Sequence, residues 1–182
     1  MALKATIYKL KLSIADIDKG YYADQNLTLA RHPSETEERL MLRLLAFVLF
    51  ASDSLMFTRG LSTDDEPDLW DRDLTGSITH WIELGTPDES RVRKGCARAD
   101  AMIVLTYGVP QAWAWWEKLR HKLTRFDNLE VLFVSPDYCG ALSALVGRSM
   151  DIQATLQEGQ IWLSTTTENV ALTPEVWKRR PG

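Results

Sequence analysis

The sequence predicts a mixed α/β protein of the α+β kind, in which a mixed central sheet is flanked by helices. Three observations predict this fold class. Alternating apolar and polar residues over 3–17 and 21–29 indicate an N-terminal β-hairpin. Strand and helix patterns then alternate from residue 78 to residue 148, and a second hairpin, 151–157 with 160–164, is predicted as a C-terminal elaboration. Antiparallel strands followed by such alternation indicate a mixed sheet.

The first half of the chain contains the hairpin and one helix. The apolar positions of the first strand move from odd to even numbers, which predicts a bulge near residues 8–9. Ser34, followed three residues later by Glu37, is a capping box and predicts a helix over about 34–52. Glu38 lies one turn before the apolar residues of this helix and shares their side, so it is predicted to project towards the core.

The second half begins with a short strand or helix end over 55–58 and an acidic loop over 64–68. A strand is predicted over 78–84, with Trp81 and Glu83 on one face. A second capping box, with Thr86 at the N-cap position, predicts a helix that ends near Ala99. Strands are also predicted over 101–107 and 129–134, and helices over 110–121 and 137–148.

Composition limits the possible classes of protein. The 182 residues suit a single domain, 1–182, and 45% hydrophobic residues allow a sizeable core. The net charge of −4 argues against a surface that binds nucleic acid all over, although it allows a local basic groove. The two cysteines provide no disulfide framework. The longest apolar segment, 40–51, is interrupted by Arg43 and is too short to cross a bilayer, so we expect a cytoplasmic protein without a membrane anchor.

Two acidic residues are the first candidates for chemistry. Glu83 lies within an apolar strand, where a carboxylate costs several kcal/mol unless a metal ion, a cation or a hydrogen-bond network compensates it. Asp68 follows a proline in the acidic loop. The alternative without chemistry is a buried salt bridge from Glu83 to Arg91, Lys94 or Arg59, with Asp68 as a turn residue.

Several sequence blocks resemble the bacterial YaeQ family, and the resemblance covers nearly the whole chain. These blocks are Arg31-His32-Pro33-Ser34-Glu35, Phe57-Thr58-Arg59-Gly60-Leu61, Asp64-Asp65-Glu66-Pro67, Trp81-Ile82-Glu83-Leu84-Gly85 with Pro87-Asp88-Glu89, Lys94-Gly95-Cys96, Gln153-Ala154-Thr155-Leu156-Gln157 and Ile161-Trp162-Leu163-Ser164. The family is grouped with the restriction-endonuclease-like fold, whose active enzymes carry a PD-(D/E)xK signature. The resemblance therefore implies a three-layer fold with a four-stranded mixed sheet between helices.

The resemblance also implies which acids would form a metal site. Pro67-Asp68 matches the Pro-Asp of the signature, and Glu83 matches its second acid. Glu38 or Glu35 corresponds to an upstream helix glutamate that often joins the site. Together these acids would hold Mg²⁺ or Mn²⁺, which prefer oxygen ligands.

One position departs from the signature. The residue two places after the second acid is Gly85 where the signature has lysine. Some members of the superfamily supply this cation from the following helix, where the candidates are Lys94, Arg91 and Arg98. Arg91 lies closer to the apolar side of that helix, but Lys94 comes first because it stands in a block that matches the family.

Two functions follow from these residues and the resemblance. The first is a metal-dependent nuclease or phosphodiesterase, with Asp68, Glu83, Lys94 and Glu38 as its catalytic residues. The second is a catalytically silent relative that binds a protein or nucleic-acid partner, and the resemblance implies a regulatory or virulence-associated role for it. A base-stacking surface formed by the tryptophans of the 110–121 helix is a further alternative, but we expect Trp113 and Trp116 in the core and Trp115 half exposed.

Overall fold

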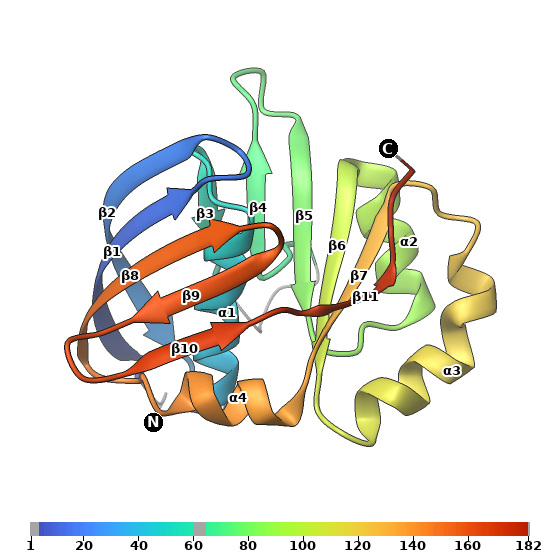
Figure 1. The fold of residues 1–182 in the computed structure, drawn as a ribbon. Coiled ribbons are helices and arrows are strands. Elements are labelled where there is room, and N and C mark those ends of the chain that lie inside the picture. The colour runs from blue at the N-terminus through green and yellow to red at the C-terminus, as the bar shows by residue number, and fades with distance from the viewer. Residues whose placement is uncertain (1–3, 60–64, 182) are drawn as a thin grey trace. The chain divides into compact units, whose positions relative to one another are not determined.

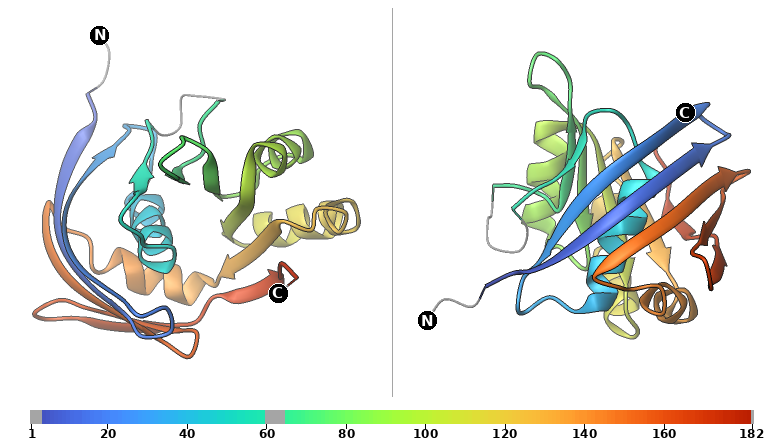
Figure 2. Two further views of the ribbon diagram at one scale, coloured as in Figure 1. Left: turned by 90° about the horizontal axis from the view of Figure 1, so that it is seen from above. Right: turned by 90° about the vertical axis from the view of Figure 1, so that its left-hand side faces the viewer.

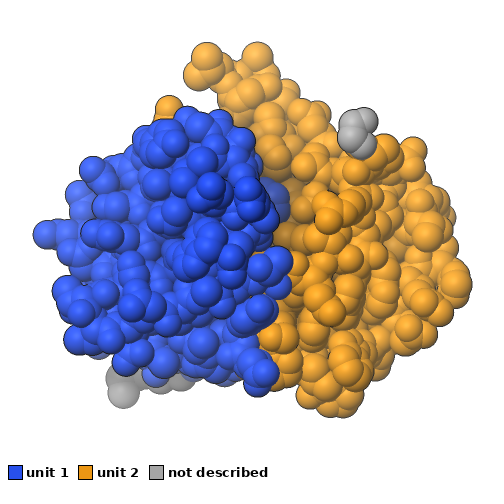
Figure 3. All heavy atoms as spheres, viewed as in Figure 1, with its two compact units in different colours: residues 1–51, 137–173 blue, residues 52–136, 174–182 orange. Residues whose placement is uncertain are grey.

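The computed structural model of the protein describes residues 4–59 and 65–181. By its internal contacts the chain divides into two compact units, each assembled from two segments, which Figure 3 colours separately. Unit 1 comprises residues 1–51 and 137–173, and unit 2 comprises residues 52–136 and 174–182. The single domain expected over residues 1–182 stays a prediction.

Unit 1 contains one mixed sheet and two helices among its described residues. The elements are β1 (Thr6–Asp16), β2 (Tyr21–Arg31), α1 (Glu37–Leu49), α4 (Pro136–Ser143), β8 (Ser149–Gln157), β9 (Gln160–Ser164) and β10 (Asn169–Leu172). The strand order is β10-β9-β8-β1-β2, in which β1 and β8 run parallel and the other pairs are antiparallel. The sheet curves around α1, as Figure 2 shows.

Both predicted hairpins are confirmed. Strands β1 and β2 pair over their full lengths, and Gly20 takes a positive φ of 66° in the turn. Strands β8 and β9 are joined by Glu158 and Gly159, both with positive φ, which matches the right-handed twist of the two strands. The bulge predicted near Tyr8 and Lys9 is wrong, because Tyr8 is buried and Ile7 is exposed. Even-numbered residues therefore face the core along all of β1.

Helix α1 is almost entirely surrounded by protein. Every residue from Leu40 to Val48 is buried. Its N-cap is Thr36, whose side chain accepts a hydrogen bond from the backbone N–H of Arg39 at 3.1 Å. The predicted N-cap, Ser34, is two residues too early; its hydroxyl lies 2.6 Å from Nδ1 of His32 instead.

Unit 2 is built around a six-stranded mixed sheet. Its elements are β3 (Leu55–Phe57), β4 (Leu69–Arg72), β5 (Ile78–Leu84), α2 (Glu89–Arg98), β6 (Ala99–Tyr107), α3 (Gln111–Leu123), β7 (Leu129–Val134) and β11 (Glu175–Lys178). The strand order is β11-β7-β6-β5-β4-β3, with β5, β6 and β7 parallel to one another. Helices α2 and α3 lie side by side on one face of the sheet (Figures 1 and 2).

The core of unit 2 lies between this face and the two helices. It includes Trp81, Val92, Met102, Val104, Trp115, Leu119, Leu123, Leu129 and Val131. Gly95 allows α2 to approach β6 closely, because a Cβ atom at this position would overlap Sδ of Met102 and contact the ring of Trp81. The glycine is thus a packing requirement of the helix that carries the candidate cations.

The α+β fold class is confirmed, with two mixed sheets and four helices in the part of the chain that the structure describes. The predicted helix over 137–148 is shorter than expected, since α4 ends at Ser143. Strands β4, β10 and β11 were not predicted. Of the helices in residues 4–59 and 65–181, none is both long and apolar enough to span a membrane.

Candidate functional site

Asp68 and Glu83 are brought together by the pairing of β4 with β5. Leu69 opposes Ile82 in this antiparallel pair, and the N–H of Asp68 donates to the carbonyl of Ile82 at 3.0 Å. Asp68 therefore continues the strand opposite Glu83. A carboxylate oxygen of Asp68, Oδ2, accepts a hydrogen bond from the N–H of Leu84 at 2.8 Å. The two acids are 6% and 7% exposed, so both are buried.

Glu83 faces α2 and is held by two donors. Alternation along β5 places it on the same face as Trp81, whose indole Nε1 donates to Oε1 of Glu83 at 2.9 Å. The guanidinium Nε of Arg91 donates to the same oxygen at 2.7 Å. Both donors therefore fix the orientation of one carboxylate oxygen.

Arg91 is itself fixed in place by further contacts. Its Nη2 donates to the backbone carbonyl of Glu66, in the segment that leads to Asp68. Its guanidinium also lies 5.7 Å from the ring centroid of Trp81. Arg91 thus links the start of α2 to the segment before β4 and to the end of β5.

The pKa of Glu83 is shifted by its burial and by neighbouring charges. Burial raises the pKa of the Glu83 carboxyl above its ordinary value, and the negative charge of Asp68 raises it further. The charge of Arg91 and the hydrogen bonds from Trp81 and Arg91 oppose this effect without cancelling it. A buried carboxyl with a raised pKa beside a second acid is a feature typical of functional sites, although structural ion pairs produce it too.

The backbone conformation explains why residue 85 is glycine and not the lysine of the signature. Gly85 directly follows β5 and has a positive φ of 97°, a conformation that residues with a Cβ rarely adopt. Its N–H donates to the carbonyl of Leu105 at 3.0 Å, which anchors the turn on β6. A lysine at this position would strain the turn that connects β5 to α2.

The three candidate cations of α2 have different partners. Arg91 is the one that binds Glu83. Lys94 donates to Asp65 at 2.8 Å, and Arg98 lies 3.9 Å from the same carboxylate. The hydrogen bond from Lys94 lowers the pKa of Asp65. Asp65 is 81% exposed, so the contact of Lys94 is with the surface of the acidic loop. A catalytic role for Lys94 stays a prediction.

The predicted upstream acids belong to unit 1. Glu35 is buried and binds Arg43 at 2.7 Å and Arg39 at 3.1 Å, so two arginines already neutralise it. Glu38 is half-buried on α1. Burial raises the pKa of the Cys139 thiol to about 12, with a further contribution from the charge of Glu38. The role of Glu38 as a third acid stays a prediction.

No group of three or more His, Cys, Asp and Glu side chains that could hold a metal ion is present among residues 4–59 and 65–181. Asp68 and Glu83 do lie next to each other on the paired ends of β4 and β5, and their role as metal ligands stays a prediction. Gly60, Leu61 and Asp64 of the family blocks lie outside the described residues.

The tryptophan prediction for α3 is wrong. Trp115 is the buried residue, and its Nε1 donates to the carbonyl of Pro87 at 2.6 Å. Trp113 is 54% exposed. Trp116 is half-buried and lies 5.6 Å from Trp177 between ring centroids. Trp115 therefore helps to position the loop that precedes α2, and with it Arg91.

The N-cap predicted for α2, Thr86, is also wrong. The helix starts after Asp88, whose side chain accepts from the N–H of Arg91 at 2.8 Å, and not after Thr86. Arg91 is therefore in the first turn of α2. A cap at Asp88 could have been found from the sequence, since aspartate is as good an N-cap as threonine. Predicting the N-cap at Asp88 would still not have shown which cation of α2 reaches Glu83.

Comparisons with known proteins agree on one family. The family described as "YaeQ protein" matches residues 1–174. The YaeQ protein of Escherichia coli (strain K12) is 46% identical over 179 residues, which covers 98% of this chain and 99% of the relative. The crystal structure of YaeQ from Xanthomonas axonopodis pv. citri has a TM-score of 0.92 and 49% identity, covering 97% of this chain and 99% of that one.

A second solved structure is less similar in sequence but has nearly the same fold. It is YaeQ from Pseudomonas syringae, with a TM-score of 0.91 and 32% identity over 98% of both chains. Sequence and structure thus agree along almost the whole length, and the chain belongs to the YaeQ family.

Proposed function

We propose that unit 2 carries a metal-dependent phosphodiesterase site of the restriction-endonuclease-like type, acting on nucleic acid in the cytoplasm. The observation that carries the proposal is the pair of buried acids, Asp68 and Glu83, with Arg91 reaching Glu83 from the following helix. In this proposal Asp68 and Glu83 hold the metal ion. Arg91 takes the place of the signature lysine that Gly85 cannot supply.

The fold of unit 2 supports this assignment. Strands β4, β5, β6 and β7 form a four-stranded mixed sheet, which β3 and β11 extend on either side. Asp68 directly precedes β4, and Glu83 lies near the end of β5. Helix α2 follows the second acid directly.

The acids fit a hard divalent cation. Both are carboxylates, the donors that Mg²⁺ and Mn²⁺ prefer. Trp81 and Arg91 both donate to Oε1 of Glu83, so we expect an ion to use Oε2. A positive ion would also relieve the repulsion from Asp68 that raises the pKa of Glu83. When bound, Mg²⁺ supplies Lewis-acid activation of water and neutralises charge on a phosphate.

Groups of the protein then have three tasks. Leu84 orients Asp68 through its backbone N–H, and Trp81 orients Glu83 through its indole N–H. Arg91 provides the positive charge for a phosphate, because its planar guanidinium can bind two phosphate oxygens at once. In this proposal Arg91 exchanges Glu83 for the phosphate when substrate binds.

The test is a calorimetric titration with Mn²⁺. The wild type should bind the ion, and Glu83→Gln and Asp68→Asn should each weaken binding at least tenfold. Asp71→Asn is the matched control, since Asp71 is a buried acid of β4 that accepts hydrogen bonds from Ser52 and Ser54. Nuclease assays on the same proteins should show Mn²⁺-dependent cleavage that Asp68→Asn abolishes. Binding that survives both site variants would refute the metal site.

We also propose a second candidate, a catalytically silent protein that binds a partner and has a regulatory role. The observation that favours it is the 2.7 Å ion pair between Arg91 and Glu83, which supplies the charge that a metal ion would bring. Arg91→Gln separates the two candidates. In the metal site this change removes a competing cation and should tighten Mn²⁺ binding. In the silent protein it should only destabilise the fold.

A further inference from the structure

The segment of unit 2 that carries α2 and α3 is rich in basic residues. Residues 89–125 contain eight Arg and Lys residues and three Asp and Glu residues, in a chain whose net charge is −4. Arg93, Lys122 and Arg125 are between 55% and 62% exposed, and Lys118 is also exposed. We call these four residues the α2–α3 basic surface.

Helical geometry places these cations together. Lys118, Lys122 and Arg125 follow one another at spacings of four and three residues, so they form a line along α3 and the turn after it, about 10 Å long. The buried residues of α3, such as Leu119 and Leu123, occupy another side of the helix. Arg93 joins the line from α2, which lies beside α3 (Figure 1).

A single carboxylate gathers three of the four cations. Oε1 of Glu89 lies 3.0 Å from Nη2 of Arg125 and 3.5 Å from Nη2 of Arg93, and Oε2 lies 3.6 Å from Nζ of Lys122. One negative charge cannot neutralise three positive ones. The group therefore keeps a net charge of about +2, and Lys118 adds to it.

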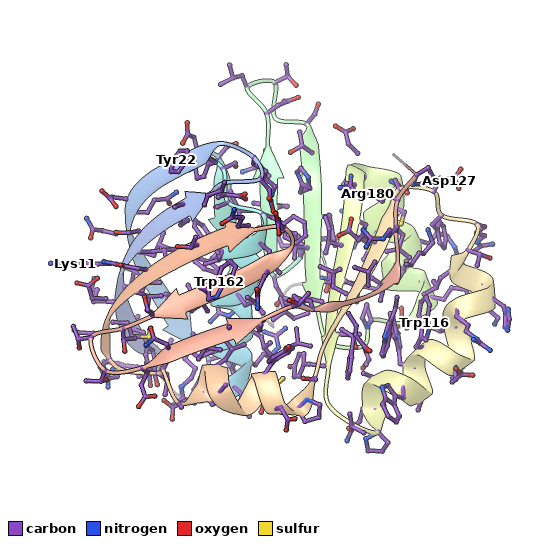
Figure 4. All side chains as sticks on the ribbon, in the orientation of Figure 1. Lys11, Tyr22, Trp116, Asp127, Trp162 and Arg180 are labelled. Atoms are coloured by element: carbon purple, nitrogen blue, oxygen red, sulfur yellow. The ribbon has the colours of Figure 1, made fainter. Side chains whose placement is uncertain are left out.

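The surroundings of the cations suit an extended ligand. Arg125 lies 4.7 Å from the ring centroid of Phe126, which restricts its guanidinium. Beside it is an open hollow of about 320 Å³ lined by Arg93, Cys96, Ala97, Arg125, Phe126, Asp127 and Asn128. An open hollow edged by two arginines can accept a chain that crosses the surface. Figure 4 labels Asp127, the acid at its rim.

We propose that the α2–α3 basic surface binds the phosphate backbone of duplex nucleic acid. Closely spaced cations on a line about 10 Å long match a polymer with regularly repeated charge, and such contacts position a duplex without reading its sequence. The choice of nucleic acid among polyanions rests on the proposed phosphodiesterase function. The attraction of this surface for polyanions follows from its charge alone and does not depend on that function.

The test measures binding of a fluorescein-labelled 20-base-pair duplex by fluorescence anisotropy in EDTA. The triple variant Arg93→Gln, Lys122→Gln, Arg125→Gln should bind at least tenfold more weakly than the wild type. The slope of log K against log salt should become shallower by about 2–3, because up to three phosphate contacts are lost. Circular dichroism should show both proteins folded.

The matched control removes the same charge from unit 1. The variant Lys4→Gln, Lys9→Gln, Lys11→Gln changes three exposed residues, of which Lys11 points away from the sheet in Figure 4. Its affinity should stay within about twofold of the wild type. Equal weakening by the two triple variants would overturn the proposal, because binding would then follow net charge alone.

Glu89→Gln should act in the opposite direction. Removing the shared carboxylate frees its three cations, so the duplex should bind several-fold more tightly. A loss of affinity in Glu89→Gln overturns the proposal. Competition experiments give a second test: if polyglutamate or anionic lipid vesicles compete as well as unlabelled duplex of the same total charge, the proposal is also overturned. Because EDTA removes metal ions, duplex binding can succeed while Mn²⁺ binding at Asp68 and Glu83 fails, or the reverse.

Discussion

Replacing Arg91 by glutamine tests the electrostatics of the candidate site most directly. The change removes the cation bound to Glu83 at 2.7 Å and the hydrogen bond from Arg91 to the carbonyl of Glu66. Glu83 then stays buried beside Asp68, and the indole N–H of Trp81 still donates to it. The folded state should lose stability whether or not a metal ion binds.

The size of the loss follows from burial. Removing one partner of a buried ion pair costs about 3–5 kcal/mol. The side chains of Arg91 and Glu83 are 22% and 9% exposed, so water reaches the pair from the arginine side and reduces the cost. We expect a decrease of about 2–3 kcal/mol in the free energy of unfolding. For a chain of this length that lowers Tm by roughly 4–12 °C.

The loss should depend on pH. Burial and Asp68 raise the pKa of Glu83 in the folded protein, and removing Arg91 raises it further. A carboxyl whose pKa is higher in the folded than in the unfolded state destabilises the fold as pH rises through the folded pKa. Below the unfolded pKa of about 4.3 this penalty disappears. The stability difference between the wild type and Arg91→Gln should therefore be largest near pH 8 and shrink towards pH 5.

Urea unfolding at pH 8, 7, 6 and 5 measures this difference. Glu83→Gln combined with Arg91→Gln should recover most of the lost stability, since the carboxylate that Arg91 compensates is then removed as well. Arg93→Gln is the matched control; its pair with Glu89 spans 3.5 Å on the surface and should contribute less than about 1 kcal/mol. A loss that does not change with pH, or one that the double variant does not relieve, would refute the reasoning.

Three further predictions concern backbone, packing and thiols. Gly85→Ala should cost about 1–2 kcal/mol in urea unfolding because of its φ of +97°, whereas Gly140→Ala in α4, where a Cβ meets no atom within 4 Å, should be neutral or stabilising. Gly95→Ala should cost about 1–3 kcal/mol by overpacking against β6, also measured by urea unfolding. Burial raises the pKa of Cys96 to about 11 and that of Cys139 to about 12. Iodoacetamide should therefore modify both thiols slowly at pH 8, which mass spectrometry can measure. The rate of modification at Cys96 should rise about tenfold from pH 8 to pH 9, because the thiolate fraction rises by that factor.

Strands with a clear period and a clear turn could be predicted from sequence. The ranges 78–84, 129–134 and 160–164 coincide with β5, β7 and β9. Strands β4, β10 and β11 have four residues each, which is too short for a two-residue period to stand out. Their pairing partners, far away in the sequence or across a turn, decide their conformation.

Both N-caps predicted from capping boxes lie two residues before the observed N-caps. In each segment a second good N-cap residue follows the first, Thr36 after Ser34 and Asp88 after Thr86. Local chemistry does not separate such candidates, because the hydrogen bond of either side chain stabilises a helix start about equally. Packing of the helix on its sheet selects one of them.

The sequence did contain a signal for the orientation of α3. Trp115, Leu119 and Leu123 are spaced by four residues and are all buried. The pair Trp113 and Trp116 suggested another side of the helix because tryptophan is large and apolar. The series Trp115, Leu119 and Leu123 indicates the buried side correctly, because the residues that face the core must lie on one side along the whole helix.

The backbone at Gly85 explains why the cation of this site comes from α2. The chain leaves β5 with a positive φ, which strains any residue that has a Cβ, so a lysine at this position would weaken the turn. The first turn of α2 is the next structure that faces Glu83, and Arg91 stands there directly after the Asp88 cap. Arginine suits this position better than lysine because its fork binds Glu83 and the carbonyl of Glu66 at the same time. Arg91→Lys should therefore keep the positive charge but lose one of these contacts, and it should fall between the wild type and Arg91→Gln in stability.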